Sequence, residues 1–377
     1  MDSLEEFFAC DNGPNGRTLR RGQWASDDYH VFEKILKKIL LDQRHEFSRT
    51  EQLNGKTKTL IPLSIHFIWL GNKPLPRYSS LGSQDGSLLD GCNHLWNETM
   101  QSWKNHHPGW KLQLWDERKI LKLFGEVDGL CQSLLTSLLR LFRQASESQS
   151  YGMASDIARL LILYQCGGVY VDVDYFCVES VQAFHEKFEF YCGASNTGCI
   201  EINNGLIGSI PKHPFLLVLL RKISTWFKEQ ERDSSAKDAP SKSSNSDLHG
   251  SLISSFLDTD TIASLQHAMR TYTAMEVITH TGPGLLTRSI LEQFRDQQIG
   301  RKIDGTISIC DMCLYPTFGI LKSRVFNPLP NIYRKIGLNA PTGTRQNNSE
   351  ENASHTLQNF RTNETKAIHL WSCSWQR

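Results

Sequence analysis

The 377-residue sequence has no long hydrophobic run and almost no net charge. Its longest apolar stretches, residues 160–164 and 215–220, are too short to cross a bilayer as a helix. The 41 lysines and arginines balance 40 aspartates and glutamates, which leaves no global field to attract nucleic acid. The acidic, polar start MDSLEEFFACDNG does not resemble a secretory signal. We therefore expect a cytoplasmic protein with no transmembrane segment and no nucleic-acid partner.

Paired cysteine motifs are scarce. Ten cysteines are scattered along the chain, several of them in apolar segments where a free thiol packs as a small hydrophobic group. This distribution favours a reducing compartment. Only Cys310 and Cys313 are close in sequence, and no second pair or nearby histidine stands at ligand spacing. Zinc or redox use of this pair is therefore less favoured than ordinary packing.

Residues 151–179 carry the charges and glycines on which the other predictions depend. Their sequence is YGMASDIARLLILYQCGGVYVDVDYFCVE. Apolar residues cover nearly every face of the first half, which predicts a helix buried almost all round. Asp156 and Arg159 are unusual in such a helix. Their i, i+3 spacing places them on one face, where they can pair or share a ligand.

A strand is predicted to follow this helix. The glycine pair 167–168 supplies the left-handed conformations that end a helix, and residues 169–174 then alternate with period two. The alternation places Tyr170, Asp172 and Asp174 on one side. Two carboxylates this close on a buried strand repel each other unless a cation or hydrogen-bond donors lie between them. An Asp-x-Asp by itself more often begins a solvated loop, and a divalent ion with a diphosphate is the alternative.

The order of these residues resembles the sugar-nucleotide site of the DXD-containing glycosyltransferases of family 32. The matched features are Ser155-Asp156, Arg159, Gly167-Gly168, Tyr170 and Asp172-Val173-Asp174. This family includes the initiating mannosyltransferases of yeast and the inositol-phosphoceramide mannosyltransferases, and the stretch is also similar to the catalytic domains of glucosylating bacterial toxins. The resemblance runs from about residue 62 to residue 375. It implies an α/β fold of the GT-A type, a nucleotide-diphospho-sugar transferase fold with a mixed central sheet flanked by helices.

The segments before the central stretch fit such a fold. Residues 62–71, PLSIHFIWLG, are a nearly continuous apolar run and predict a buried strand with Trp69 at its carboxyl end. Trp69 is either a core residue or a platform for a nucleotide base, and the resemblance favours the base. The next elements are expected in chain order as a helix at 93–105, a strand at 110–115, a helix at 117–124 capped by Asp116 and a leucine-rich helix at 130–142.

The second half of the chain predicts further strands and helices. Asn203-Asn204 lies in a predicted strand and is either a turn or the counterpart of the family's asparagine pair near the donor sugar. The elements expected here are strands at 188–194 and 200–208, a helix at 213–229, a flexible insertion at about 231–250, a helical segment at 261–271, a strand at 277–281, a helix at 283–294 and a polar loop at about 339–365. Residues 1–60, with an amphipathic helix at 27–47, are predicted to extend a catalytic domain of residues 61–377.

The resemblance assigns two further segments to the site. Gly282 opens a helix whose exposed amides can hold an anion, and its Thr-Gly-Pro context is similar to a family segment. In the closing segment AIHLWSCSWQR, His369, Ser374 and Trp375 resemble the family's final motif, although Cys373 stands where many relatives have glycine. A lone histidine beside apolar residues is more often a buried core group. The ligand role of His369 therefore comes from the resemblance.

The resemblance implies a retaining glycosyltransferase that moves a hexose or N-acetylhexosamine from a UDP- or GDP-linked sugar to a glycan, sphingolipid or protein acceptor. Mn²⁺ or Mg²⁺ is expected on Asp172, Asp174 and His369. The expected catalytic residues are Asp156, Arg159, Asp172 and Asp174, and the expected donor-binding residues are Trp69, Asp156, Arg159, Tyr170, Asp172, Asn204, Gly282, Ser374 and Trp375. The alternatives are a non-catalytic nucleotide-sugar or cation-binding protein and a nucleotide-sugar hydrolase. For localisation, the Golgi lumen of many eukaryotic relatives is the alternative to the cytoplasm.

Overall fold

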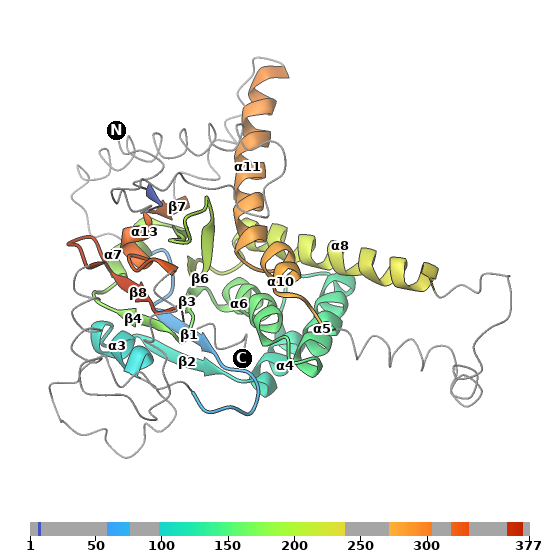
Figure 1. Ribbon diagram of the computed structural model, residues 1–377, viewed down its shortest axis with the longest axis horizontal. Helices are drawn as coiled ribbons and strands as arrows, with labels where there is room; N and C mark the ends of the chain where they lie inside the picture. Colours follow the sequence, from blue (N-terminus) through green and yellow to red (C-terminus); the bar gives the residue numbers. More distant parts are fainter. Residues whose placement is uncertain are drawn as a thin grey trace, which may run out of the picture.

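A mixed sheet divides the protein into two layers of helices (Figure 1). The computed structural model describes residues 7–8, 59–75, 98–237, 271–303, 318–331 and 360–371. Within these residues the sheet contains β1 (Ser64–Ile68), β2 (Lys111–Trp115), β3 (Gly168–Val171), β5 (Phe190–Ala194), β6 (Ile202–Ser209) and β7 (Phe318–Leu321). The order is β2-β1-β3-β6-β5-β7, and only β6 among these strands runs antiparallel to its neighbours. The predicted α/β class with a mixed central sheet flanked by helices is confirmed.

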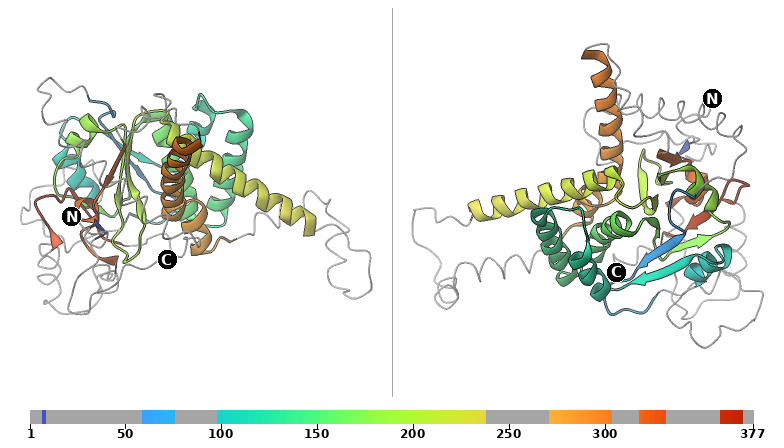
Figure 2. Two further views of the ribbon diagram at one scale, coloured as in Figure 1. Left: turned by 90° about the horizontal axis from the view of Figure 1, so that it is seen from above. Right: turned by 180° about the vertical axis from the view of Figure 1, so that it is seen from behind.

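Helices cover both faces of this sheet, as the two views of Figure 2 show. One layer contains α5 (Gln132–Glu147), α6 (Tyr151–Cys166), α8 (Pro214–Lys237), α10 (Ala274–His280) and α11 (Pro283–Ile303), with α4 (Glu117–Glu126) beside α5. The other layer contains α3 (Glu98–His106), α7 (Gln182–Lys187), α13 (Ser323–Phe326) and a ribbon of β4 (Tyr175–Cys177) and β8 (Ala367–His369). The far ends of α8 and α11 project beyond the sheet in different directions (Figure 1).

Each layer has its own hydrophobic core, because side chains along a strand alternate between the two faces. The core on the α6 side takes Tyr170 from β3 and Ile207 from β6. The core on the α3 side takes Val169 and Val171 from β3, with Leu206 from β6. A sheet covered on both faces explains why every residue of β1 and β3 is buried.

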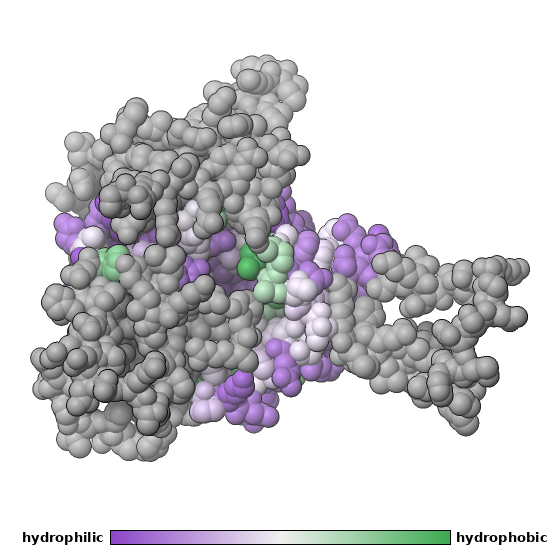
Figure 3. Space-filling model, in the orientation of Figure 1, coloured by the Kyte–Doolittle hydropathy of each residue, from purple (hydrophilic) through white to green (hydrophobic). Residues whose placement is uncertain are grey.

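Few apolar side chains remain on the surface of the described ranges. The large hydrophobic residues that are more than a third exposed there are Leu60, Leu63 and Met275. On the face seen in Figure 3, the hydrophobic patches among the coloured residues are small and lie between hydrophilic ones. None of the helices in the described part of the chain has the length and hydropathy that crossing a membrane requires.

The strand directions gather the candidate residues at one edge of the sheet. Because β1, β3 and β5 are oriented alike and β6 is reversed, the carboxyl ends of the first three and the amino end of β6 share this edge. Trp69 follows β1, Asp172 follows β3 and Asn204 lies near the start of β6. Ligands of open α/β sheets bind outside the carboxyl ends of the strands.

Most predicted elements are present with shifted ends. The strand at 62–71 is β1, the strands at 110–115, 188–194 and 200–208 are β2, β5 and β6, and the helices at 117–124, 130–142 and 283–294 are α4, α5 and α11. Asp116 caps α4 as predicted, with its carboxylate accepting from the Lys119 N–H at 2.8 Å. Asn203 and Asn204 lie within β6, so the alternative of a turn at this pair is wrong.

The predicted strand over residues 169–174 is too long. β3 ends at Val171, and residues 172–174 form a turn into β4. The Thr99 hydroxyl donates to the Val173 carbonyl oxygen, and the Tyr175 N–H donates to the Asp172 carbonyl oxygen at 3.1 Å. These bonds replace the ladder to β6, and β4 pairs with β8 instead. The period-two pattern alone could not reveal this exchange of partners, because it depends on residues far along the chain.

Two further predictions are corrected in the second half. Residues 277–281, predicted as a strand, lie in and just after α10. The Thr273 hydroxyl accepts from the Glu276 N–H, and the Glu276 carboxylate accepts from the Thr273 N–H. This capping box starts a helix and outweighs the strand preference of the β-branched residues that follow. The predicted insertion at 231–250 is also wrong at its start, because α8 continues to Lys237.

Several predictions lie largely outside the described residues. They are the helix at 27–47, the helical segment at 261–271, most of the loop at 339–365, the Cys310 and Cys313 pair and the site residues Ser374 and Trp375. Of the predicted extension at 1–60, Phe7 and Phe8 are described, and both are buried in the core on the α6 side. The described cysteines, Cys131, Cys166, Cys177, Cys192 and Cys199, are free thiols.

Three buried histidines are held in their neutral form. His66 donates from Nε2 to the Gly167 carbonyl oxygen and accepts at Nδ1 from the Trp115 indole. His107 and His185 likewise have one donating and one accepting nitrogen. Burial lowers the pKa of His66 and His107 to about 4 and that of His185 to about 3. A second proton on His66 or His107 would place an N–H against another N–H donor.

We expect these histidines to make the fold sensitive to acid below pH 6.5. Because their folded-state pKa values lie below the ordinary value of 6.5, the unfolded chain binds protons first, and stability falls as the pH is lowered toward 4. The fully expressed shifts correspond to about 3–5 kcal/mol each. Burial raises the pKa of Asp156 to about 6 and also raises those of Asp172 and Glu201, and these shifts have the opposite sign. Urea unfolding should give a free energy several kcal/mol lower at about pH 5 than at about pH 7.5. Equal values would contradict this expectation.

Candidate functional site

Arg159 is a buried cation that joins α6 to the edge of the sheet. Its Nη2 atom lies 3.1 Å from Asp156 Oδ1 and 3.4 Å from Asp172 Oδ1. Its Nη1 atom donates to the Asn204 carbonyl oxygen at 2.7 Å, and its guanidinium carbon lies 4.5 Å from the centre of the Tyr170 ring. Burial lowers the pKa of Arg159, but Asp172, Tyr170 and Asp156 raise it above its ordinary value overall. The side chain is therefore a permanent cation between two carboxylates.

Asp156 accepts hydrogen bonds from two other elements of the fold. Asn204 of β6 donates from Nδ2 to Oδ1 at 2.8 Å, and the Thr281 hydroxyl at the end of α10 donates to Oδ2 at 2.9 Å. Burial raises the pKa of Asp156 to about 6, while Arg159 and Thr281 oppose the rise. The predicted neighbours Asp156, Arg159 and Asn204 are thus in direct contact, although Asn204 comes from a separate strand.

A small pocket opens beside Asp156 and Arg159. Its polar lining is Asp156, Arg159, Asn204, Thr281 and Gly282, and its apolar lining is Leu160, Ile207, Leu219, Leu285 and Leu286. The free space is about 10 Å³, which is room for about one water molecule, and its polar groups can hydrogen bond to a hydroxyl that reaches it. Thr281 also lines this pocket. The sequence indicated no role for this residue other than its place in the Thr-Gly-Pro segment.

Gly282 lines this pocket without offering its amide. Its N–H donates to the Val277 carbonyl oxygen at 2.8 Å and so completes the end of α10. A Cβ atom here would lie 3.0 Å from that oxygen and 3.3 Å from Asp156 Oδ2. The absence of a side chain therefore allows the close approach of α10, α11 and α6, and the Gly282 N–H is not the anion donor that the sequence suggested.

The Asp-x-Asp segment forms a turn whose first carboxylate is already engaged. Asp172 Oδ1 accepts from the Tyr170 hydroxyl at 2.5 Å and lies beside Arg159. Burial raises the pKa of Asp172, and Arg159 opposes this effect. Tyr170 therefore contacts both members of the Arg159–Asp172 ion pair. This agrees with the prediction that Tyr170 and Asp172 lie on the same side of the chain. The Asp172 side chain remains 29% exposed, so its carboxylate can reach a ligand.

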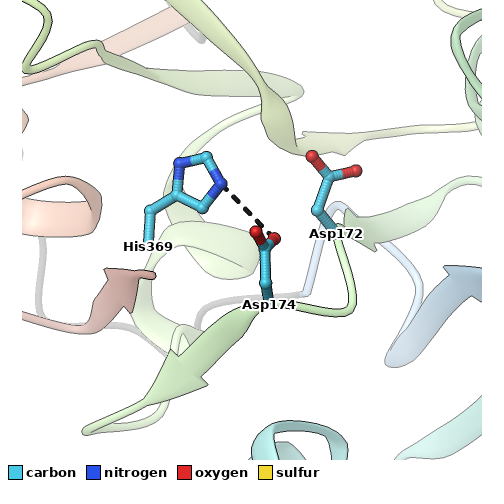
Figure 4. Close-up of side chains that lie close together, drawn as sticks. All are labelled: Asp172, Asp174 and His369. Atoms are coloured by element: carbon cyan, nitrogen blue, oxygen red, sulfur yellow. Dashed lines mark ion pairs between the residues drawn. The ribbon is translucent and has the colours of Figure 1, made fainter. Parts of the chain in front are cut away.

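Asp174 and His369 meet from segments that are far apart in the sequence. Asp174 lies just before β4, and His369 ends β8, its antiparallel partner. The His369 Nε2 atom is 3.3 Å from Asp174 Oδ1, and both side chains are about nine-tenths buried. Asp172, Asp174 and His369 each offer one ligand atom, and these atoms lie within 4.8 Å of one another around a common space (Figure 4).

These three side chains fit a divalent cation. Two carboxylates at this separation repel each other in a partly buried site, and a cation between them removes the repulsion. Carboxylate oxygens suit Mg²⁺ and Mn²⁺, and an imidazole nitrogen is a common ligand of transition metals. The sequence prediction that these residues come together is therefore matched by their positions in the structure.

The other predicted site residues are only partly placed. Trp69 lies at the same edge of the sheet, half-buried, and its indole N–H donates to the Lys73 carbonyl oxygen at 2.6 Å. This bond orients the ring after β1. Ser374 and Trp375 lie beyond the described residues. The sequence gave no indication of Tyr175 and Asn327. Their side chains are hydrogen bonded to each other beside the site, and the Tyr175 hydroxyl also donates to Asn203, a member of the predicted asparagine pair.

Residues 93–191 match a protein family described as the glycosyltransferase sugar-binding region containing DXD motif. The match includes α6 with Asp156 and Arg159, and the turn with Asp172 and Asp174. This part of the chain is therefore similar to the sugar-binding region of DXD-containing glycosyltransferases.

Two yeast proteins are similar to about a third of this chain. Inositol phosphoceramide mannosyltransferase 1 of Schizosaccharomyces pombe is 30% identical over 133 residues, which cover 34% of this chain and 38% of that protein. Mannosyl phosphorylinositol ceramide synthase SUR1 of Saccharomyces cerevisiae is 26% identical over 134 residues, which cover 35% and 31%. The chain thus spans less than two-fifths of the length of either relative. Among solved structures, PaToxG Glycosyltransferase is 14% identical with a TM-score of 0.37, covering 76% of this chain and 92% of that one.

Proposed function

We propose that the protein is a metal-dependent glycosyltransferase that takes its sugar from a nucleoside-diphosphate donor. The observation that carries the proposal is the convergence of Asp172, Asp174 and His369 from two distant segments, next to the pocket of Asp156 and Arg159. A cation site beside hydrogen-bonding groups such as those of Asp156 and Arg159 is what a diphosphate linked to a sugar requires. The match of residues 93–191 to a sugar-binding region supports this reading.

Asp172, Asp174 and His369 would hold Mn²⁺ or Mg²⁺. The bound cation would supply electrostatic stabilisation of the charge that develops on the departing diphosphate. Arg159 would hold Asp172 in place and face a donor phosphate or hydroxyl, while Asp156 would accept a hydrogen bond from a sugar hydroxyl. Asn204 and Thr281 already orient the Asp156 carboxylate, so its position is set before a donor binds.

The remaining parts of the proposal concern the reaction and its substrates. We propose retention of the anomeric configuration, a catalytic domain of residues 61–377 with the GT-A fold, and a nucleotide base stacked on Trp69. The names of the two yeast relatives make mannose the first donor sugar to test and an inositol phosphoceramide the first acceptor. Glycans and protein side chains are the other acceptor classes to test.

An assay of donor cleavage tests the proposal. The purified protein is incubated with UDP- and GDP-sugars and Mn²⁺, with and without candidate acceptors, and released diphosphate and glycosylated product are measured. We expect release that depends on the cation and increases with one acceptor, with the product's anomeric configuration retained. No release with any donor favours a binding protein. Release that no acceptor increases favours a hydrolase, and an inverted product contradicts retention.

Gly205 of β6 provides a sharper test of the cation site. A Cβ atom at this position would lie 2.6 Å from Asp172 Oδ2 and 2.9 Å from Asn203 Oδ1, closer than real contacts allow. Tyr170 and Arg159 restrain the carboxylate, so it cannot move without losing their contacts. We expect Gly205→Ala to displace Asp172 and weaken Mn²⁺ binding by about tenfold or more in calorimetry.

A glycine with free space supplies the control for this variant. A Cβ atom at Gly125, in α4, would meet nothing within 4 Å. Gly125→Ala should therefore bind Mn²⁺ as the wild type does and be slightly more stable. Wild-type Mn²⁺ affinity in folded Gly205→Ala would show that Asp172 is not part of the cation site.

A further inference from the structure

Tyr175 connects parts of the site that are far apart in sequence. It begins β4 directly after the aspartate turn and pairs with His369 across the β4–β8 ribbon. Its N–H closes the turn on the Asp172 carbonyl oxygen at 3.1 Å. Its own carbonyl oxygen accepts from the Trp103 indole of α3 at 2.9 Å. The side chain is fully buried, so its contacts are protected from water.

The Tyr175 ring lies flat against the His369 imidazole. The ring centres are 4.3 Å apart and the planes differ by 4°. Trp371 also contacts the imidazole, with ring centres 4.1 Å apart and planes inclined by 39°. Rotation of the imidazole out of its plane would break the stack with Tyr175. The stack therefore favours the orientation in which His369 Nε2 faces Asp174.

Two asparagine side chains hold the far end of the Tyr175 ring. The hydroxyl lies 2.7 Å from Asn327 Oδ1 and 3.1 Å from Asn203 Oδ1. Both amides are oriented by other bonds, because Asn327 Nδ2 donates to the Ala194 carbonyl oxygen at 2.8 Å and Asn203 Oδ1 accepts from the Gly205 N–H at 2.6 Å. The hydroxyl therefore faces two acceptors with one proton, so it acts as a donor and not as an acceptor.

We infer that Tyr175 is a positioning residue for the cation site. Its ring holds the His369 imidazole toward the two aspartates, and Asn203 and Asn327 hold the ring. Groups behind a metal ligand fix its orientation, and their loss commonly costs 10–100-fold in metal affinity. The inference rests on the proposed function of the site, because it assigns Tyr175 a role through His369 and not through contact with substrate.

Paired variants at two buried tyrosines test this inference. Tyr191 is a suitable control because it is also fully buried, belongs to the same core as Tyr175 and has its hydroxyl bonded to His185 Nε2 at 3.1 Å. Mn²⁺ affinity is measured by calorimetry in Tyr175→Leu, Tyr175→Phe, Tyr191→Leu and Tyr191→Phe. We expect about a 100-fold loss for Tyr175→Leu and about a tenfold loss for Tyr175→Phe, which keeps the stack but not the hydroxyl. The two Tyr191 variants should bind as the wild type does.

Equal losses at the two tyrosines, or unchanged affinity in the Tyr175 variants, would overturn the inference. If Tyr175→Leu does not fold, the comparison of the two phenylalanine variants decides it. A crystal structure of metal-free Tyr175→Phe or Tyr175→Leu shows the position of the His369 ring without any cation. A displaced His369 ring supports the inference even if the wild type binds no Mn²⁺, a result that would refute only the proposed function. An unmoved ring overturns the inference.

Discussion

Replacing Asp174 with asparagine is expected to lower donor cleavage by a factor of about 10³ while the protein remains folded. The carboxylate of Asp174 faces His369, and both lie within 4.8 Å of an Asp172 ligand atom. An amide of nearly the same size keeps the packing but removes a negative charge from the cation site. Because a weakly held cation cannot stabilise the departing diphosphate, the loss should appear chiefly in kcat. Steady-state assays at saturating Mn²⁺ measure it.

An exposed aspartate offers the matched control for this substitution. Asp128 forms a surface ion pair with Lys212 at 2.7 Å and lies outside the site. Asp128→Asn should keep wild-type activity, since such pairs contribute at most about 1 kcal/mol. A folded Asp174→Asn variant that is as active as Asp128→Asn would remove Asp174 from the mechanism.

Replacing Arg159 with methionine is expected to destabilise the fold by about 3–5 kcal/mol. Methionine fills much of the same space but leaves the carboxylates of Asp156 and Asp172 without their shared cation. Both side chains of the Arg159–Asp156 pair are about 6% exposed, so water cannot replace the lost contact. The Asn204 carbonyl oxygen also loses its donor. Urea unfolding at neutral pH measures the change.

The surface pair Arg140–Glu231 is the appropriate comparison for Arg159. Arg140 is 61% exposed, and its Nη2 atom lies 2.5 Å from the Glu231 carboxylate. Arg140→Met should change the free energy of unfolding by less than about 1 kcal/mol. Similar changes in the two variants would mean that Arg159 is not a structural cation. A pH profile adds a second test. Loss of Arg159 raises the pKa of Asp156 further above its ordinary value, so the difference between wild type and Arg159→Met should shrink as the pH falls toward about 6.

The elements of the sheet could be predicted because each carries a local signal. β1 and β3 are short apolar runs closed by turns, and Gly167 and Gly168 adopt the positive φ angles that their position after α6 requires. Asp116 reveals the start of α4 in the same way. Where two local signals competed, as at Val277, the capping box at Thr273 and not the β-branched residues decided the structure.

The site could be predicted only as far as its charges stand out against an apolar background. Burying the charges of Asp156, Arg159 and the Asp-x-Asp segment is unfavourable, so their presence in an apolar region indicates a functional role. Tyr175 and Asn327 give no such indication, because a tyrosine after an aspartate turn and an asparagine far along the chain are common residues. Their meeting depends on how β4 pairs with β8 and where the segment after β7 returns. No pattern within one segment contains that information.

A crystal soaked in Mn²⁺ and a nucleoside diphosphate tests the central claim most directly. Anomalous scattering locates the manganese independently of the protein atoms. The account predicts one peak within about 2.0–2.6 Å of oxygens of Asp174 and the diphosphate, with Asp172 and His369 in the same ligand shell directly or through water. A bound nucleotide with no peak between Asp172, Asp174 and His369, or a peak at another place with these side chains turned to solvent, would contradict it.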